Sequence, residues 1–133
     1  MIVDTSAIIA ILFSEADAKR YATAISEADV CRVSSATFVE VAIVVEAQTK
    51  NSGSRQLDAF MRRAAIGIEP FTVEHAHLAR QAYTDFGKGR HRAALNYGDC
   101  FSYALAKATA EPLLFKGEDF RKTDIIAALP KEP

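Results

Sequence analysis

The apolar residues of this chain form short continuous runs that alternate with longer stretches of helical periodicity. The short runs are rich in aliphatic residues and are bounded by polar or turn-forming residues, which is typical of buried strands. We expect these strands at 1–3, 30–34, 66–71 and 112–116. The longer stretches predict helices at 5–13, 15–28, 36–48, 55–65, 73–86 and 99–109.

Strands that alternate with helices in this way predict an α/β fold. The sheet should be parallel, with four or five short strands and helices on both faces. Hydroxyl side chains stand near the start of several predicted helices, where they satisfy free backbone N–H groups. On this basis we expect Ser14, Ser35 and Thr72 to be N-caps.

The amino-acid composition is that of a globular protein. A chain of 133 residues with 50% hydrophobic and 25% charged residues is typical of one globular domain, which we expect to span 1–133. No apolar run is long enough for a membrane span, and no secretory signal pattern precedes the first strand, so a cytoplasmic location without membrane contact is the default expectation. Cys31 and Cys100 lie in apolar contexts and are expected to be buried thiols.

The net charge of −1 does not by itself indicate a nucleic-acid-binding protein. A nucleic-acid-binding surface would therefore have to come from a local cluster of basic residues. The densest positive run is the predicted loop 88–92, which carries Lys88, Arg90 and Arg92. It is either a solvated loop or a surface that contacts phosphates. Nearby Tyr97, or Phe120 further along, could stack on a base.

Four acidic residues are expected to meet at the carboxyl edge of the sheet. Asp4 ends the first strand, Asp119 follows the last strand, and Asp99 begins a helix. Glu40 lies early in the helix after the second strand, among apolar neighbours. Each has a structural explanation: a helix cap for Asp4 and Asp99, a capping box for Glu40 and a turn for Asp119.

Carboxylates that gather at one edge repel each other, and a hard cation relieves this repulsion. Mg²⁺ and Mn²⁺ prefer oxygen ligands and leave positions for water and phosphate oxygens. The chemistry that this arrangement permits is in-line hydrolysis of a phosphodiester by metal-activated water. One metal ion or two are both compatible with four carboxylates.

The acids lie in motifs that resemble those of PIN domains, and specifically of VapC-type toxin ribonucleases from bacterial toxin–antitoxin pairs. The motifs are at 3–7, at Ser35 with Glu40, at 97–100 and at 113–120. The resemblance covers almost the whole chain. It implies a PIN-like fold and a Mg²⁺- or Mn²⁺-dependent endoribonuclease that cuts a structured RNA such as tRNA or rRNA. It also implies a homodimer, neutralised by a cognate VapB-like antitoxin whose tail occupies the active-site groove.

Carried over by position, the resemblance makes Asp4 and Asp99 the principal metal ligands. Glu40 would bind metal or orient the attacking water. The fourth motif departs from the family pattern at Gly117, where many relatives have an acid or asparagine, so that Glu118 or Asp119 could complete the cluster; we favour Asp119.

The hydroxyls beside Asp4 complete the predicted site. Either Thr5 or Ser6 would hydrogen-bond the carboxylates or a phosphate. The alternative from another functional class is a catalytically silent PIN-like module that only binds another protein.

Overall fold

The computed structural model describes residues 1–50 and 52–132 of the chain. Over these residues the helices and strands follow one another in the alternating order that the sequence predicts. The strands are β1 (Ile2–Val3), β2 (Cys31–Ser34), β3 (Ile66–Glu69) and β4 (Leu113–Leu114). The helices are α1 (Thr5–Leu12), α2 (Ala18–Glu27), α3 (Ser35–Thr49), α4 (Gly53–Arg63), α5 (Val73–Phe86), α6 (Tyr97–Thr109) and the 3-10 turn η1 (Phe120–Lys122).

The four strands form one parallel sheet in the order β3-β2-β1-β4. The short strand β1 lies inside the sheet, with Ile2 in register with Arg32 of β2 and with Leu113 of β4. Because all strands run the same way, the residues that follow β1 and β4 emerge at one edge of the sheet. The prediction of a parallel α/β sheet is therefore confirmed, with four strands.

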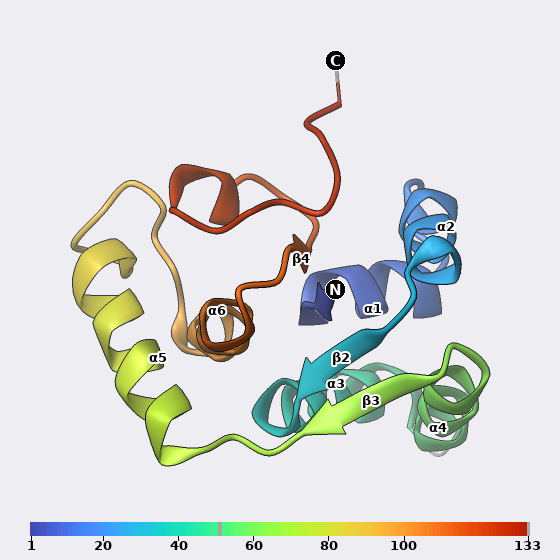
Figure 1. Ribbon diagram of the computed structural model, residues 1–133. Helices are drawn as coiled ribbons and strands as arrows, with labels where there is room; N and C mark the ends of the chain where they lie inside the picture. The colour runs from blue at the N-terminus through green and yellow to red at the C-terminus, as the bar shows by residue number, and fades with distance from the viewer. Residues whose placement is uncertain (51, 133) are drawn as a thin grey trace.

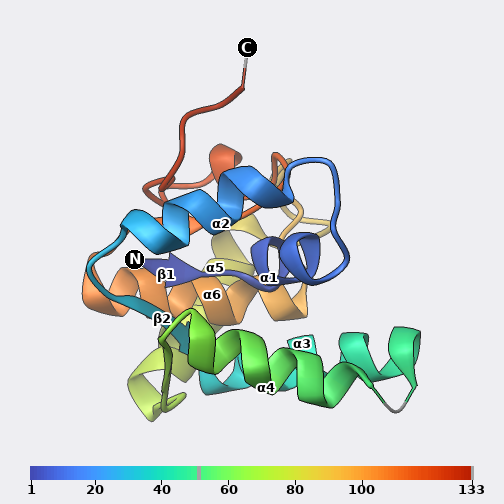
Figure 2. The ribbon, with the colours of Figure 1, turned by 90° about the vertical axis from the view of Figure 1, so that its right-hand side faces the viewer.

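Helices pack on both faces of the sheet, as Figure 1 shows. Val3 and Leu114 belong to the core shared with α1 to α4, whereas Ile2 and Leu113 belong to the core shared with α5 and α6. The quarter-turn view of Figure 2 shows α2 and α4 on either side of β1 and β2, with α5 and α6 behind them. This alternation along two-residue strands is the expected period of an extended chain with both faces buried.

Helices α1 and α5 begin at the expected residues, whereas the starts of the other α-helices differ from the expected positions by one to three residues. Ser14 does not cap α2: it has a φ of 51°, and the helix begins at Ala18. Ser34, and not Ser35, caps α3, by accepting a hydrogen bond from the N–H of Ala36. Thr72 caps α5 as predicted, through the N–H of His75.

Cys31 and Cys100 are both buried free thiols, as predicted. Among the described residues, no helix combines the length and the apolar character that crossing a bilayer requires.

Candidate active site

Asp4 is the most deeply buried of the predicted acids, with 3% of its surface exposed. It follows β1 directly and caps α1, because its Oδ2 accepts hydrogen bonds from the backbone N–H of Ser6 at 3.0 Å and from the Ser6 hydroxyl at 2.6 Å. The Ser6 oxygen also accepts the backbone N–H of Lys116, just after β4, at 2.9 Å. Ser6 therefore joins the ends of two neighbouring strands to one carboxylate.

The second oxygen of Asp4 contacts a residue that sequence reasoning did not identify. Oδ1 accepts a hydrogen bond of 2.6 Å from the hydroxyl of Ser102, which is fully buried in α6. The hydroxyl of Thr37, in α3, lies 3.4 Å from that of Ser102. The available signal was the spacing: Ser102 is three residues after Asp99, and residues three apart lie on the same face of a helix.

Glu40 is held by contacts with two other motifs. Thr5 donates its hydroxyl proton to Oε1 of Glu40, which links α1 to α3. Gly98 lies against the same carboxylate, since a Cβ placed at Gly98 would come within 1.8 Å of Glu40 Oε2. The capping-box interpretation of Glu40 is wrong, because Ser34 is the N-cap and Thr37 points to Ser102 instead.

Asp99 is part of the cap of α6, which begins two residues earlier than expected. Asn96 is the N-cap: its side chain accepts the N–H of Asp99 at 2.8 Å, and Asp99 Oδ2 accepts the N–H of Asn96 at 3.0 Å. Burial is the main cause that raises the pKa of the Asp99 carboxyl from 3.8 to about 7. The hydrogen bond from Asn96 opposes this, while the negative charges of Asp4, Asp119 and Glu40 raise the pKa further.

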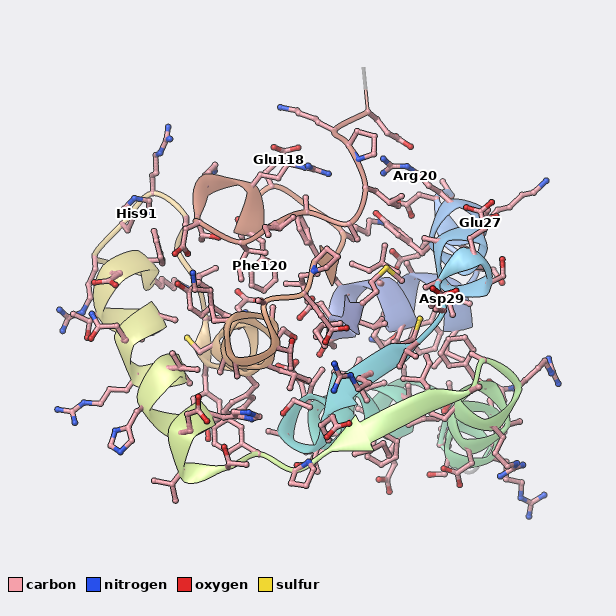
Figure 3. All side chains as sticks on the ribbon, in the orientation of Figure 1. Arg20, Glu27, Asp29, His91, Glu118 and Phe120 are labelled. Atoms are coloured by element: carbon pink, nitrogen blue, oxygen red, sulfur yellow. The ribbon has the colours of Figure 1, made fainter. Side chains whose placement is uncertain are left out.

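The two candidates for the fourth acid differ in their surroundings. Asp119 precedes η1, makes no capping hydrogen bond with its side chain, and is close enough to Asp99 to raise its pKa. Glu118 instead forms an exposed ion pair with Lys131 at 3.4 Å, and Figure 3 shows it beside the carboxyl-terminal tail. This geometry favours Asp119 over Glu118 as the fourth member of the cluster.

The acids do not form a closed metal cage. Within the described part of the chain, no three His, Cys, Asp or Glu side chains are close enough together to hold an ion as they stand. Asp99 Oδ1 and Glu40 Oε2 accept no hydrogen bond from a described protein group. This donor set fits an open site for Mg²⁺ or Mn²⁺, because such ions often use one or two carboxylates together with water and phosphate oxygens.

The predicted RNA-contacting residues are not joined to the acids. Among the described residues, no hydrogen bond or ion pair links Lys88, Arg90 or Arg92 to the cluster, and Arg90 lies over the Tyr83 ring. All three basic residues are exposed. His91, in the same loop, lies near the carboxyl-terminal end of α5 in Figure 3.

The two aromatic candidates for base stacking differ in exposure. Tyr97 is 79% exposed at the start of α6. Stacking by Phe120 is excluded, because its ring is buried and packs against Phe115. Figure 3 shows Phe120 below the ribbon of η1. An apolar residue in a short turn after a strand can close the core as readily as face solvent, and periodicity does not distinguish the two.

Comparison with known proteins identifies the family. The PIN domain family matches residues 1–126. Ribonuclease VapC30 of Mycobacterium tuberculosis is 50% identical over 131 residues, which cover 98% of this chain and 100% of the relative. Ribonuclease VapC28 of the same species is 53% identical over 130 residues, covering 97% and 98% of the two chains. Ribonuclease VapC of Mycolicibacterium smegmatis is 50% identical over 127 residues, covering 96% and 98%.

Among solved structures, that of Mycobacterium tuberculosis VapC20, described as a sarcin–ricin loop cleaving toxin, superposes with a TM-score of 0.77. It covers 97% of this chain and 98% of its own, at 17% sequence identity, and so supports the fold. Fold, motifs and sequence identity over nearly the whole length agree with one another. The chain belongs to the PIN-domain family, as a VapC-type ribonuclease.

Proposed function

We propose that this protein is the toxin of a type II toxin–antitoxin pair and cleaves a structured RNA, such as tRNA or rRNA, as a Mg²⁺- or Mn²⁺-dependent endoribonuclease. The proposal is carried by the convergence on Asp99 of Asp4 after β1, Glu40 in α3 and Asp119 after β4; burial together with the charges of these acids raises the pKa of Asp99. Ionised carboxylates that lie close together repel one another, and a divalent cation relieves this repulsion.

In this proposal the four acids have different roles, which follow from their surroundings. Asp4 and Asp99, each held by a helix cap, are the principal metal ligands. Glu40, fixed by Thr5, binds metal or orients the attacking water, and Asp119 completes the cluster. When bound, the cation would supply a water of lowered pKa and stabilise charge on the phosphate.

Positive side chains of the loop after α5 support an RNA substrate. Lys88, Arg90 and Arg92 are exposed and free of ion pairs among the described residues. They would neutralise phosphates at a distance from the reacting centre, and Thr5 and Ser6 would act inside it by orienting carboxylates.

The test is cleavage of total bacterial RNA by the purified protein, with Mg²⁺ or Mn²⁺ and with excess EDTA. Asp4→Asn and Asp99→Asn should each abolish cleavage, whereas Asp58→Asn, which replaces an exposed carboxylate on α4, should leave it unchanged. Discrete fragments that require both metal and Asp4 would support the proposal. Absence of cleavage under every metal condition would favour the catalytically silent binding module.

An exposed apolar surface beside Glu40 supports a protein partner. A hollow of about 440 Å³ is lined by Glu40 and by apolar side chains of α3 and α6. Val39, Ile43 and Tyr97 are 54%, 62% and 79% exposed there. We propose that a VapB-like antitoxin covers this surface and thereby closes the acidic site. Co-expression with the cognate VapB-like antitoxin should give a stable complex without ribonuclease activity.

A second apolar hollow supports self-association. It has a volume of about 610 Å³ between α5 and α6 and is lined by residues that include Phe71, Tyr83 and Phe101. We propose a homodimer of chains that each fold as one domain over 1–133 and act in the cytoplasm. Light scattering of the purified toxin should give twice the mass of 14.5 kDa, and a monomer at micromolar concentration would contradict the dimer.

A further inference from the structure

We propose that Ser102 is a positioning residue for Asp4 and through it sets the affinity of the acidic site for a divalent cation. This rests on the proposed metal-dependent function. The Ser102 hydroxyl donates to Asp4 Oδ1 at 2.6 Å, a length typical of a hydroxyl bonded to an ionised carboxylate. Ser102 is fully buried and Asp4 is 3% exposed, so water has little access to compete for this hydrogen bond.

The hydrogen bonds of Asp4 show what Ser102 adds. A carboxylate has about four lone-pair positions, two on each oxygen. Oδ2 accepts both the N–H and the hydroxyl of Ser6, which fills its positions. Oδ1 accepts only Ser102 among the described residues, which leaves one position for a cation. Ser6 holds one oxygen and Ser102 the other, so together they fix the plane of the carboxylate and the direction of its free lone pair.

Thr37 extends this support into α3. Its hydroxyl lies 3.4 Å from that of Ser102, and both side chains are fully buried. Because the single proton of the Ser102 hydroxyl is used on Asp4, Thr37 is the donor of this pair. The hydroxyls of Thr37 and Ser102 thus form a chain that ends on Asp4 and joins α3 and α6 to the residue that follows β1. The longer distance predicts a weaker effect for Thr37 than for Ser102.

The experiment is a calorimetric titration of the full-length protein with Mn²⁺, comparing wild type, Ser102→Ala and Thr109→Val. Thr109 is the matched control: it lies in the same helix, and its hydroxyl donates to the carbonyl of Leu105 at 2.9 Å. Loss of a partner that orients a metal ligand typically costs 10–100-fold in metal affinity. We therefore expect the Kd for Mn²⁺ to rise about 10–100-fold in Ser102→Ala and less than about twofold in Thr109→Val.

Two further measurements separate positioning from a merely structural role. The melting temperature in EDTA reports stability, and the Mn²⁺ concentration for half-maximal RNA cleavage reports affinity during turnover. A positioning role predicts a higher half-saturating Mn²⁺ concentration, with much of the rate recovered at saturation. A lower melting temperature with an unchanged Kd for Mn²⁺ would overturn the proposal.

If Ser102→Ala does not fold, variants of Thr37 test the role of the hydroxyl chain instead. Thr37→Val keeps the side-chain shape without the donor, and Thr37→Ser keeps the donor. Weaker Mn²⁺ binding in Thr37→Val, restored in Thr37→Ser, would support the hydroxyl chain; equal binding in the two would contradict it. If the wild type itself binds no Mn²⁺, both the metal-dependent function and the role of Ser102 are contradicted. If the wild type and Ser102→Ala bind Mn²⁺ equally well, only the role of Ser102 is contradicted.

Discussion

Replacing Asp99 by asparagine should stabilise the metal-free protein, and the gain should grow with pH. The side-chain oxygen of asparagine can still accept the N–H of Asn96, so the cap of α6 is kept while the charge is removed. The wild-type carboxyl has its pKa raised from 3.8 to about 7 by burial and by neighbouring acids. A raised pKa favours the protonated form in the fold, so the stability it contributes is complete below pH 3.8 and is lost as pH rises through about 7.

The size of the effect follows from the two pKa values. A change from 3.8 to about 7 corresponds to roughly 4 kcal/mol, at about 1.4 kcal/mol for each tenfold change in proton affinity. Because Asp99 is only partly buried, solvent screening reduces this to roughly 2 kcal/mol. Most of that loss falls between pH 5 and pH 8. Over this interval the advantage of Asp99→Asn over wild type should increase by about 1 kcal/mol.

The assay is urea unfolding in EDTA at pH 5, 6, 7 and 8, followed by circular dichroism. Asp58→Asn is the control, and its unfolding free energy should stay within about 0.5 kcal/mol of wild type at each pH. Excess Mg²⁺ should reverse the order, because an ion that binds only the folded wild type stabilises it. A gain from Asp99→Asn that is independent of pH, or a loss at pH 8, would refute the electrostatic reasoning.

Three other substitutions or reactions test the packing around the site. Gly98→Ala should abolish RNA cleavage, since the new Cβ would come within 1.8 Å of Glu40 Oε2, whereas Gly67→Ala, where the nearest atom is at 3.8 Å, should retain it. Leu105→Ala should lower the unfolding free energy by about 3 kcal/mol, measured in urea, because Leu105 is 1% exposed. The Cys100 thiol, whose pKa is raised to about 11 by burial and by Asp99, should react with a disulfide reagent at pH 8 only after unfolding.

The sheet and its helices could be predicted from the sequence because each element carries its own signal. The pattern that predicts a helix at 73–86 gives α5 with the same bounds. The contacts within the candidate site could not be predicted in this way, because its hydrogen bonds join elements that are far apart in the chain. Ser102 and Asp4 are 98 residues apart, and Thr5 and Glu40 are 35 apart. Periodicity reports which face of an element is buried, but not which side chain of another element it meets.

Helix caps and active-site acids need not exclude one another in this protein. In the sequence, a capping role for Asp4 or Asp99 competes with a role in a site. In the structure, Asp4 is the N-cap of α1, and Asp99 is the third helical residue in the capping box that Asn96 begins. In each case the cap bond is made by Oδ2, from the N–H of Ser6 or of Asn96, and Oδ1 is not used by it. A cap of this kind fixes the rotamer of the carboxylate and places it at the positive end of a helix dipole. Capping therefore orients both carboxylates in advance, and a capping pattern at the end of a buried strand is no argument against a metal-binding role.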